Sequence, residues 1–295
     1  MSRPTLIPGA SPSELIPAMP ESVLHFLGTG GGRHAMATQK RKTAGIMLVH
    51  GSTQIHIDPG PGALVHSIYA GLTPLRLSGV VVTHCHPDHY NDAEVLVEAM
   101  TGGTTRKRGV LAAARSVLEG GENVDRSVSR YHQGLAARVE TLVPGTKFEI
   151  GDVRFESFRS LHGDADAVSL RFTASGQGDV VYTSDTELYP GYEEHCRGLR
   201  LLILGTMWPR GSPLQGHLCT DDAARLISEV KPRCAITTHY GIKIINADPA
   251  KEAAWIEEET GVPTISATDG MSLTLSDKVT AKGPRKADEP RVIDA

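Results

Sequence analysis

The stretch Thr83-His84-Cys85-His86-Pro87-Asp88-His89 directly follows an apolar run and places three imidazoles and one carboxylate at positions 84–89. Side chains alternate along an extended backbone, so His84 and His86 are expected on the same side. The proline forces a turn that directs Asp88 and His89 toward a second point nearby. A single histidine in a loop is usually a surface residue. This cluster at a strand end instead predicts the beginning of a hydrolytic site for two metal ions.

The same six positions resemble the metallo-β-lactamase superfamily, whose signature is H-x-H-x-D-H at the end of a sheet strand. They match without substitution, and the resemblance covers about residues 23–276. It implies a four-layer αββα sandwich of two mixed β-sheets with outer helices. Strand-like stretches interrupted by helices also occur in two halves of the chain, which favours the same α/β (α+β) class.

Three segments are expected along the chain. Residues 1–21 contain five prolines and predict an extended arm, and residues 22–276 form the metallo-β-lactamase-fold hydrolase domain. Residues 277–295 are charged and nearly free of large apolar side chains, which predicts a flexible tail. Strands are expected at residues 23–27, 43–49, 53–57, 80–82, 148–150, 153–157, 168–172, 180–183, 201–204, 234–237, 264–265 and 271–275, and helices at 92–100, 220–229 and 249–259.

Composition restricts the partners and the compartment. A chain of 295 residues with 40% hydrophobic content can bury a large core, and its net charge of −4 gives no general attraction to nucleic acid or anionic membrane. The four cysteines include no C-x-x-C pair, which favours a reducing cytoplasm. The start of the chain has no secretory pattern, and no apolar run approaches membrane-spanning length. We therefore expect a cytoplasmic protein without a membrane partner or a stable nucleic-acid complex.

A two-metal site needs further ligands, which we expect at strand ends because a sheet edge holds metal geometry rigidly. His162, Asp185 and His239 each follow an apolar, strand-like run. His162 fits as the third nitrogen of the first metal, and His239 completes the second. Asp185 fits as the bridge, because each of its oxygens can bind one ion. Alone, a strand-end histidine is usually structural, but these three follow the order that the superfamily resemblance implies.

Asp58 matches the early aspartate of the superfamily. It is expected to orient a metal-bound histidine or the loop rather than to touch metal, and the alternative is a turn-forming residue before proline. Coordination by five histidines and carboxylates suits two Zn²⁺ best, with Mn²⁺, Fe²⁺ or Co²⁺ as substitutes. The diiron, oxygen-reducing branch of the superfamily carries Glu at the position of His86. The histidine here therefore favours hydrolysis over redox chemistry.

The segment Gly216-His217-Leu218-Cys219-Thr220 bears on the choice of substrate. In ribonuclease Z and related phosphodiesterases, a histidine in a similar G-H-x-x-[ST] segment lies near the metals. The resemblance implies that a metal-bridging hydroxide attacks phosphorus. An imidazolium at His217 would assist by stabilising charge or by protonating the leaving oxygen. His217 and Asp88 are thus the expected catalytic residues, Asp88 also being a ligand. A helix-capping or solvent-exposed His217 is the alternative, and Thr220 is the expected N-cap of the following helix.

The length of the interval between His162 and Asp185 distinguishes this chain from ribonuclease Z itself. That enzyme carries a long tRNA-clamping arm there, whereas here 185 − 162 = 23 residues leave room for two strands and a turn. Residues 102–143 are read as an insert elsewhere that lacks the character of the arm. We therefore expect a small-molecule or single-stranded phosphodiester substrate. Relatives of ribonuclease Z are often dimers, so the resemblance also admits a homodimer.

Other readings remain open. Tyr240 and Lys243 keep lactone, carboxylic ester or thioester hydrolysis open as an alternative. The superfamily branches that catalyse these reactions use a tyrosine or basic residues near the metals. A non-catalytic metal-stabilised binding or sensor protein is the other alternative. The glycine run 28–32 would let the backbone approach the site closely, although a flexible turn explains it equally well. Charge alone suggests that Arg33, His34, Lys40 and Arg41 line the entrance.

Overall fold

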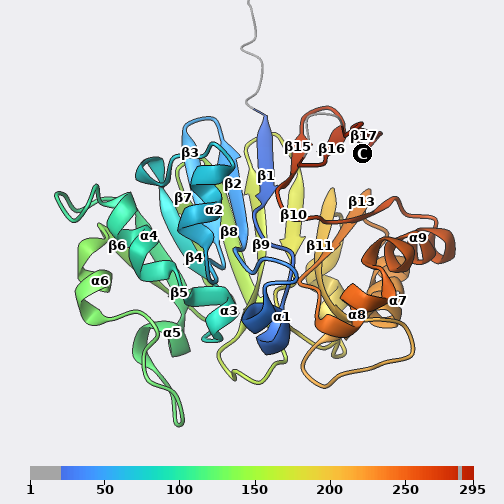
Figure 1. Ribbon diagram of the computed structural model, residues 1–295, viewed down its shortest axis with the longest axis horizontal. Helices are drawn as coiled ribbons and strands as arrows, with labels where there is room; N and C mark the ends of the chain where they lie inside the picture. The colour runs from blue at the N-terminus through green and yellow to red at the C-terminus, as the bar shows by residue number, and fades with distance from the viewer. Residues whose placement is uncertain (1–20, 285–287) are drawn as a thin grey trace, which may run out of the picture.

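The computed structural model describes residues 21–284 and 288–295, and two β-sheets lie face to face in it with helices on both outer sides (Figure 1). This arrangement confirms the expected four-layer αββα sandwich. The arm predicted at residues 1–21 lies, apart from Glu21, outside the described residues.

Within the described residues, one sheet has nine strands in the order β17-β16-β15-β1-β2-β3-β4-β5-β6. The pairs β3–β4, β4–β5 and β5–β6 are parallel and the others antiparallel, so the sheet is mixed. Its strands are β1 (Ser22–Phe26), β2 (Ile46–His50), β3 (Thr53–Ile57), β4 (Gly79–Val82), β5 (Val110–Ala114), β6 (Arg138–Leu142), β15 (Met271–Leu275), β16 (Val279–Lys282) and β17 (Arg291–Ile293).

The other described sheet runs β14-β13-β11-β10-β9-β8-β7, with β12 pairing with β11. Its β7–β10 half is antiparallel, and its β10–β14 half is parallel. Its strands are β7 (Lys147–Ile150), β8 (Val153–Arg159), β9 (Val168–Ala174), β10 (Asp179–Tyr182), β11 (Leu201–Trp208), β12 (Leu218–Cys219), β13 (Cys234–Thr238) and β14 (Thr264–Ser266).

Helices cover the outer face of each sheet. Apolar side chains of α2, α4 and α5 pack on the nine-stranded sheet, and those of α7, α9 and η2 pack on the other. A central core of mostly aliphatic residues fills the space between the sheets. The helices are α1 (Gly32–Thr38), α2 (Ala63–Tyr69), η1 (Pro74–Arg76), α3 (Pro87–Tyr90), α4 (Ala93–Met100), α5 (Arg115–Glu119), α6 (Arg130–Leu135), η2 (Tyr192–Cys196), α7 (Thr220–Val230), α8 (Ile242–Ala247) and α9 (Pro249–Thr260).

The C-terminal segment corrects one expectation. Residues 277–295 were expected to be flexible, but β16 and β17 extend the nine-stranded sheet beyond β15. Val279, Ala281 and Ile293 are buried in the core between the sheets. These three apolar side chains, at alternating strand positions, are enough to attach the segment to the sheet. The composition did not reveal them, because the apolar content of residues 277–295 as a whole is low.

A second expectation, that residues 102–143 form an insert, is also wrong. They are no insert, because β5 and β6 complete one edge of the nine-stranded sheet in parallel. The sequence of β5 is rich in alanine, which has low β propensity, so its strand character was hidden.

A smaller correction concerns α7, whose N-cap is Cys219 rather than Thr220. The Cys219 backbone N–H donates to Asp222, which completes a capping box.

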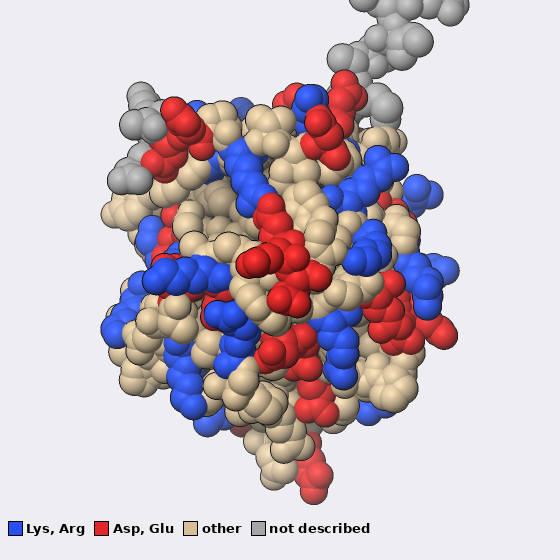
Figure 2. All heavy atoms as spheres, turned by 90° about the vertical axis from the view of Figure 1, so that its right-hand side faces the viewer, with Lys and Arg blue, Asp and Glu red and all other residues tan. Residues whose placement is uncertain are grey.

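No helix in the described part of the chain is long and apolar enough to cross a membrane. On the face that carries α7 and α9, acidic and basic side chains are interspersed, and Lys and Arg do not merge into one basic surface (Figure 2).

Candidate metal centre

Every predicted ligand lies in the segment that directly follows a strand, and Asp88 and His89 are on the short helix α3 in such a segment. The motif 83–89 follows β4, His162 follows β8, Asp185 follows β10 and His239 follows β13. These strands come from both sheets, and their loops meet at one edge of the sandwich, near α1 and α3 at the bottom of Figure 1. The interval between His162 and Asp185 holds β9, β10 and a turn, as its length predicted.

One group of possible ligands contains His84, His86, His162 and Asp185, whose ligand atoms all lie within 4.8 Å of one another. His86 Nδ1 and His162 Nε2 face each other at 3.0 Å. Asp185 Oδ2 lies 3.7 Å from His162 Nε2 and 3.9 Å from His84 Nε2. Three nitrogens and one oxygen thus lie close together, and four such donors could hold one divalent metal ion.

A neighbouring group contains Asp88, His89 and His239. His239 Nε2 lies 3.0 Å from His89 Nε2 and 3.3 Å from Asp88 Oδ2. Asp185 connects this group to the other one, because its Oδ1 lies 3.1 Å from His239 Nδ1 while its Oδ2 faces the first group. The structure therefore brings all seven predicted ligands together, with Asp185 between the two groups.

Unpaired polar atoms test whether these residues suit a metal. His84 Nε2, Asp185 Oδ1 and His239 Nδ1 are buried and have no hydrogen-bond partner within the described residues. A buried polar atom without a partner costs about 1–3 kcal/mol, and such atoms are usually satisfied in folded proteins. Because the orphaned atoms are imidazole nitrogens and a carboxylate oxygen of residues in the two ligand groups, the donor set fits divalent cations.

Protonation also suits metal binding at most of the ligands. Burial, supported by neighbouring histidines, holds the pKa of His84 well below its ordinary value, and burial lowers that of His86. Burial raises the pKa of Asp185, but His239 and His89 outweigh it and lower the pKa to about 2. For His89, burial lowers the pKa, yet Asp185, Asp58 and Asp88 together raise it to about 10. A bound cation must displace that proton.

Asp58 lies behind the ligands, at 3% exposure. Its Oδ2 accepts hydrogen bonds from His89 Nδ1 at 2.9 Å, from the Thr83 hydroxyl and from the Tyr182 hydroxyl. Its Oδ1 accepts from the Thr83 backbone N–H. The carboxylate thus holds both the His89 ring and the start of the motif loop, which is the orienting place expected for it.

His162 is oriented by the loop that carries His217. Its Nδ1 lies 2.8 Å from the Gly216 carbonyl, so it donates there and leaves Nε2 free to face the ligand group. The Gly216 N–H in turn donates to Glu187 Oε2 at 2.7 Å. Glu187 could not be recognised from the sequence, because a single acid two residues after Asp185 has no distinctive spacing.

The glycine run comes as close to the site as predicted. A Cβ at Gly31 would lie 2.3 Å from the His239 ring, and the Gly32 N–H donates to Asp88 Oδ2 at 2.6 Å. Asp269 holds this run by accepting hydrogen bonds from Thr29 and the Lys42 backbone. Asp269 was missed, because it is 240 residues from Thr29 in the chain and only the fold brings the two together.

Asp164 is a further residue that the sequence did not single out. Its carboxylate accepts hydrogen bonds from the Cys85 backbone N–H and from the Ser116 hydroxyl. It therefore attaches the motif loop to α5. The only signal was its position two residues after His162, in a loop already expected to hold a ligand.

His217 lies at the wall of the site. Its Nδ1 is 3.5 Å from Asp185 Oδ2, and its ring centroid is 4.7 Å from that of His162. Burial lowers the pKa of His217 to about 4, so its ring is neutral near pH 7 in the metal-free protein. A neutral ring still donates one N–H hydrogen bond.

A cavity of about 520 Å³ opens over the two groups. It is lined by His86, Asp88, His162, Asp185 and His217 together with residues of the α1, β11 and α8 segments, including Arg33 and His34. Lys40 and Arg41, which charge alone had placed at the entrance, are not part of its wall.

The two residues that supported ester hydrolysis are engaged elsewhere. The Tyr240 hydroxyl is fully buried and bonded to Thr237 and Ser266, away from the cavity. Lys243 Nζ lies 3.6 Å from the centroid of the Trp208 ring. Neither side chain lines the cavity.

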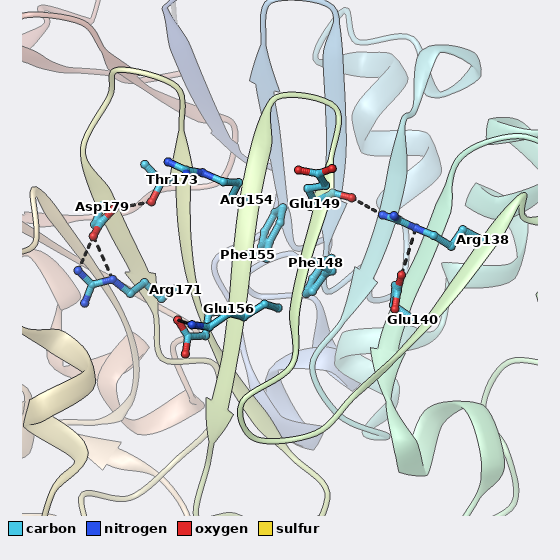
Figure 3. A pocket seen from close by; sticks show the side chains of 11 residues that line it. Arg138, Glu140, Phe148, Glu149, Arg154, Phe155, Glu156, Arg171, Thr173 and Asp179 are labelled. Atoms are coloured by element: carbon cyan, nitrogen blue, oxygen red, sulfur yellow. Dashed lines mark hydrogen bonds and ion pairs between the residues drawn. The ribbon is translucent and has the colours of Figure 1, made fainter.

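A separate hollow of about 560 Å³ lies on strands β6–β10 and contains none of the predicted site residues (Figure 3). Phe148 and Phe155 stack there at 4.9 Å between ring centroids. Its charged side chains largely pair with one another, as Arg171 does with Asp179. This hollow offers no group prepared for chemistry.

Known proteins resemble the chain over most of its length. A family model described as a beta-lactamase superfamily domain matches residues 53–240. An uncharacterized protein of Methanocaldococcus jannaschii, MJ1374, is 40% identical over 252 residues, which are 85% of this chain and 94% of that protein. A ribonuclease Z of Methanopyrus kandleri is 30% identical over 146 residues, 48% of this chain and 47% of that enzyme.

The metallo-beta-lactamase fold protein YhfI from Bacillus subtilis has a similar structure. Its TM-score is 0.70 at 18% identity, over 86% of this chain and 99% of that one. The match to the family model shows that the chain belongs to the beta-lactamase superfamily. With its ribonuclease Z-like sequence and its paired groups of His and Asp ligands, it is a metal-dependent hydrolase.

Proposed function

We propose that the protein is a dinuclear zinc phosphodiesterase acting on small or single-stranded phosphodiesters. The observation that carries this proposal is the position of His217 beside the bridging-type carboxylate, with its Nδ1 3.5 Å from Asp185 Oδ2. A histidine there can reach a phosphate held at the ligand groups. The partial similarity to ribonuclease Z supports the same substrate class.

His84, His86, His162 and Asp185 would hold one cation, and Asp88, His89 and His239 the other, with Asp185 shared. When bound, two such cations supply Lewis acidity and lower the pKa of water near neutrality. The His217 ring N–H donates to a phosphate oxygen or to the leaving oxygen, where negative charge develops. Asp58 and the Gly216 carbonyl fix the ring orientations of His89 and His162 through hydrogen bonds at 2.9 and 2.8 Å.

Lactone or thioester hydrolysis is the weaker alternative, since the Tyr240 hydroxyl is buried and bonded to Thr237 and Ser266. A sensor role needs no histidine at the cavity wall. The test is a panel of chromogenic phosphodiester, phosphotriester, lactone and β-lactam substrates with zinc-loaded protein. Preference for bis(4-nitrophenyl) phosphate is expected, and lactone hydrolysis without phosphodiester hydrolysis would contradict the proposal.

The role of His217 has its own test. His217→Ala should lower phosphodiesterase kcat by roughly a hundredfold while the metal content stays near that of the wild type, as expected of a group that assists a proton or charge. If the variant loses metal in proportion to activity, His217 is a ligand and its proposed role is wrong.

A further inference from the structure

Two hollows beside the metal centre share residues of their walls, among them Arg33 at the start of α1. One is the cavity already described, here called the Trp208 hollow. The other, here called the hairpin hollow, has about 740 Å³ and lies against the loop 121–127, which joins α5 to α6. Arg33, His86, Pro87 and Gly163 line both hollows. The two hollows therefore form the arms of a cleft whose shared wall includes one candidate ligand, His86, while Asp88, His162 and Asp185 line the Trp208 hollow only.

The walls of the two arms differ in chemistry. The Trp208 hollow is bounded by the apolar side chains of Met207, Trp208, Leu214 and Ile242. The hairpin hollow is instead bounded mostly by polar and charged residues, among them Glu122, Asn123, Asp125 and Arg126. Such a cleft suits a molecule with a substituent on each side of the bond that breaks. A diester has two substituents, whereas a monoester or a small lactone would fill one arm only.

Arg33 belongs to this shared wall. Its side chain is exposed and lines both hollows, and no hydrogen bond or ion pair to another residue in the described part of the chain occupies it. The preceding residue is fixed to the centre, because the Gly32 N–H donates to Asp88 Oδ2 at 2.6 Å. The guanidinium therefore starts from a backbone anchored to a metal ligand. A free guanidinium offers a planar pair of donors that matches two oxygens of a phosphate.

We propose that Arg33 is the residue that selects for the negative charge of a phosphodiester, whose two ester groups occupy the Trp208 and hairpin hollows. This inference rests on the proposed function and specifies its substrate class. Arg33 binds a non-bridging phosphate oxygen, and the two arms bind the substituents.

The test is calorimetric binding to zinc-loaded protein, which needs no turnover. Three ligands separate the contribution of the negative charge from that of the second ring. They are diphenyl phosphate, its neutral triester methyl diphenyl phosphate, and methyl phenyl phosphate, which keeps the charge but loses one ring. Arg33→Gln should weaken both anions about tenfold, as a lost charge-assisted hydrogen bond does, and leave the triester unchanged. Arg33→Lys should recover part of the loss. Lys40→Gln removes an exposed cation outside both hollows and serves as the matched control.

In the wild type, diphenyl phosphate should bind at least about tenfold more tightly than methyl phenyl phosphate, because the second ring is removed from water. Equal affinity of these two, or an Arg33→Gln effect that is the same for anion and triester, overturns the inference. Turnover of bis(4-nitrophenyl) phosphate is measured in parallel. If the wild type binds the anions through Arg33 but does not hydrolyse this diester, the proposed function fails and the role of Arg33 in anion binding stands.

Discussion

His89 Nδ1 donates a hydrogen bond of 2.9 Å to Asp58 Oδ2, and both side chains are almost completely buried. This contact fixes the tautomer and orientation of His89, so that Nε2 faces His239 and Asp88. An imidazole held in this way by a carboxylate is a better metal ligand than a freely rotating one.

Asp58→Asn should therefore weaken metal binding by roughly ten- to a hundredfold, because the amide removes the charge and presents N–H groups to donors. Competition with a chromogenic chelator measures the affinity. Asp152→Asn, at an exposed position, is the control. Unchanged affinity in Asp58→Asn would show that this carboxylate has only a local structural role.

Gly31→Ala should disturb the centre without unfolding the protein. The new Cβ would lie 2.3 Å from the His239 ring, so the ring must move, while the backbone at φ −146° accepts alanine. We expect loss of one of two bound metal ions, measured by elemental analysis. Gly134→Ala, which meets nothing within 4 Å, should keep both. Full metal content in Gly31→Ala would mean that His239 does not need its present position.

Tyr240→Phe separates the phosphodiesterase proposal from the ester-hydrolase alternative. The lost hydroxyl is bonded to the buried Thr237 and to the half-buried Ser266, so the free energy of unfolding should fall by about 1–3 kcal/mol. Because this hydroxyl does not reach the cavity, kcat should stay within about twofold at a temperature where the variant is folded. A large loss of kcat in the folded variant would make Tyr240 catalytic.

The lowered pKa of His56 predicts that the folded protein loses stability in acid. Burial lowers its pKa to about 4, and its hydrogen bond to the Ala44 carbonyl does not offset this. Below an unfolded-state pKa near 6.5, the unfolded chain binds a proton that the folded chain excludes. Stability is therefore lost as the pH falls, by about 2 kcal/mol between about pH 7 and 5, and the loss levels off below the folded pKa.

His56→Gln keeps a possible donor to the Ala44 carbonyl but does not titrate. Urea unfolding of metal-free protein should show a loss of stability on acidification that is smaller by about this amount than in the wild type. An equal loss in both proteins would show that His56 is not responsible.

The sequence singled out residues that the fold brings together, because each of them follows a buried strand. Alone, each strand-end residue is a weak signal, and His162, Asp185 and His239 were recognised by their order after the motif that begins at His84. The same reasoning placed the two sheets, since the strands of the core have long apolar runs.

Residues that act through tertiary contacts could not be found in this way. Asp269, Asp164 and Glu187 are ordinary acids in the sequence, and their hydrogen bonds to the glycine run, the motif loop and Gly216 exist only after folding. The lowered pKa of His217 likewise comes from burial, which a local pattern does not reveal. The strands β5 and β16 were missed because short, alanine-rich or charged sequences form strands only when a sheet edge receives them.

The central claim is that two divalent cations bind between the clustered side chains of the motif loop and the strand ends. Anomalous X-ray diffraction from crystals of the active protein, collected on both sides of the zinc absorption edge, tests it most directly. We expect one peak among His84, His86, His162 and Asp185, and a second among Asp88, His89, His239 and Asp185. Active protein with no anomalous peak at either position for zinc, manganese, iron or cobalt would contradict the account.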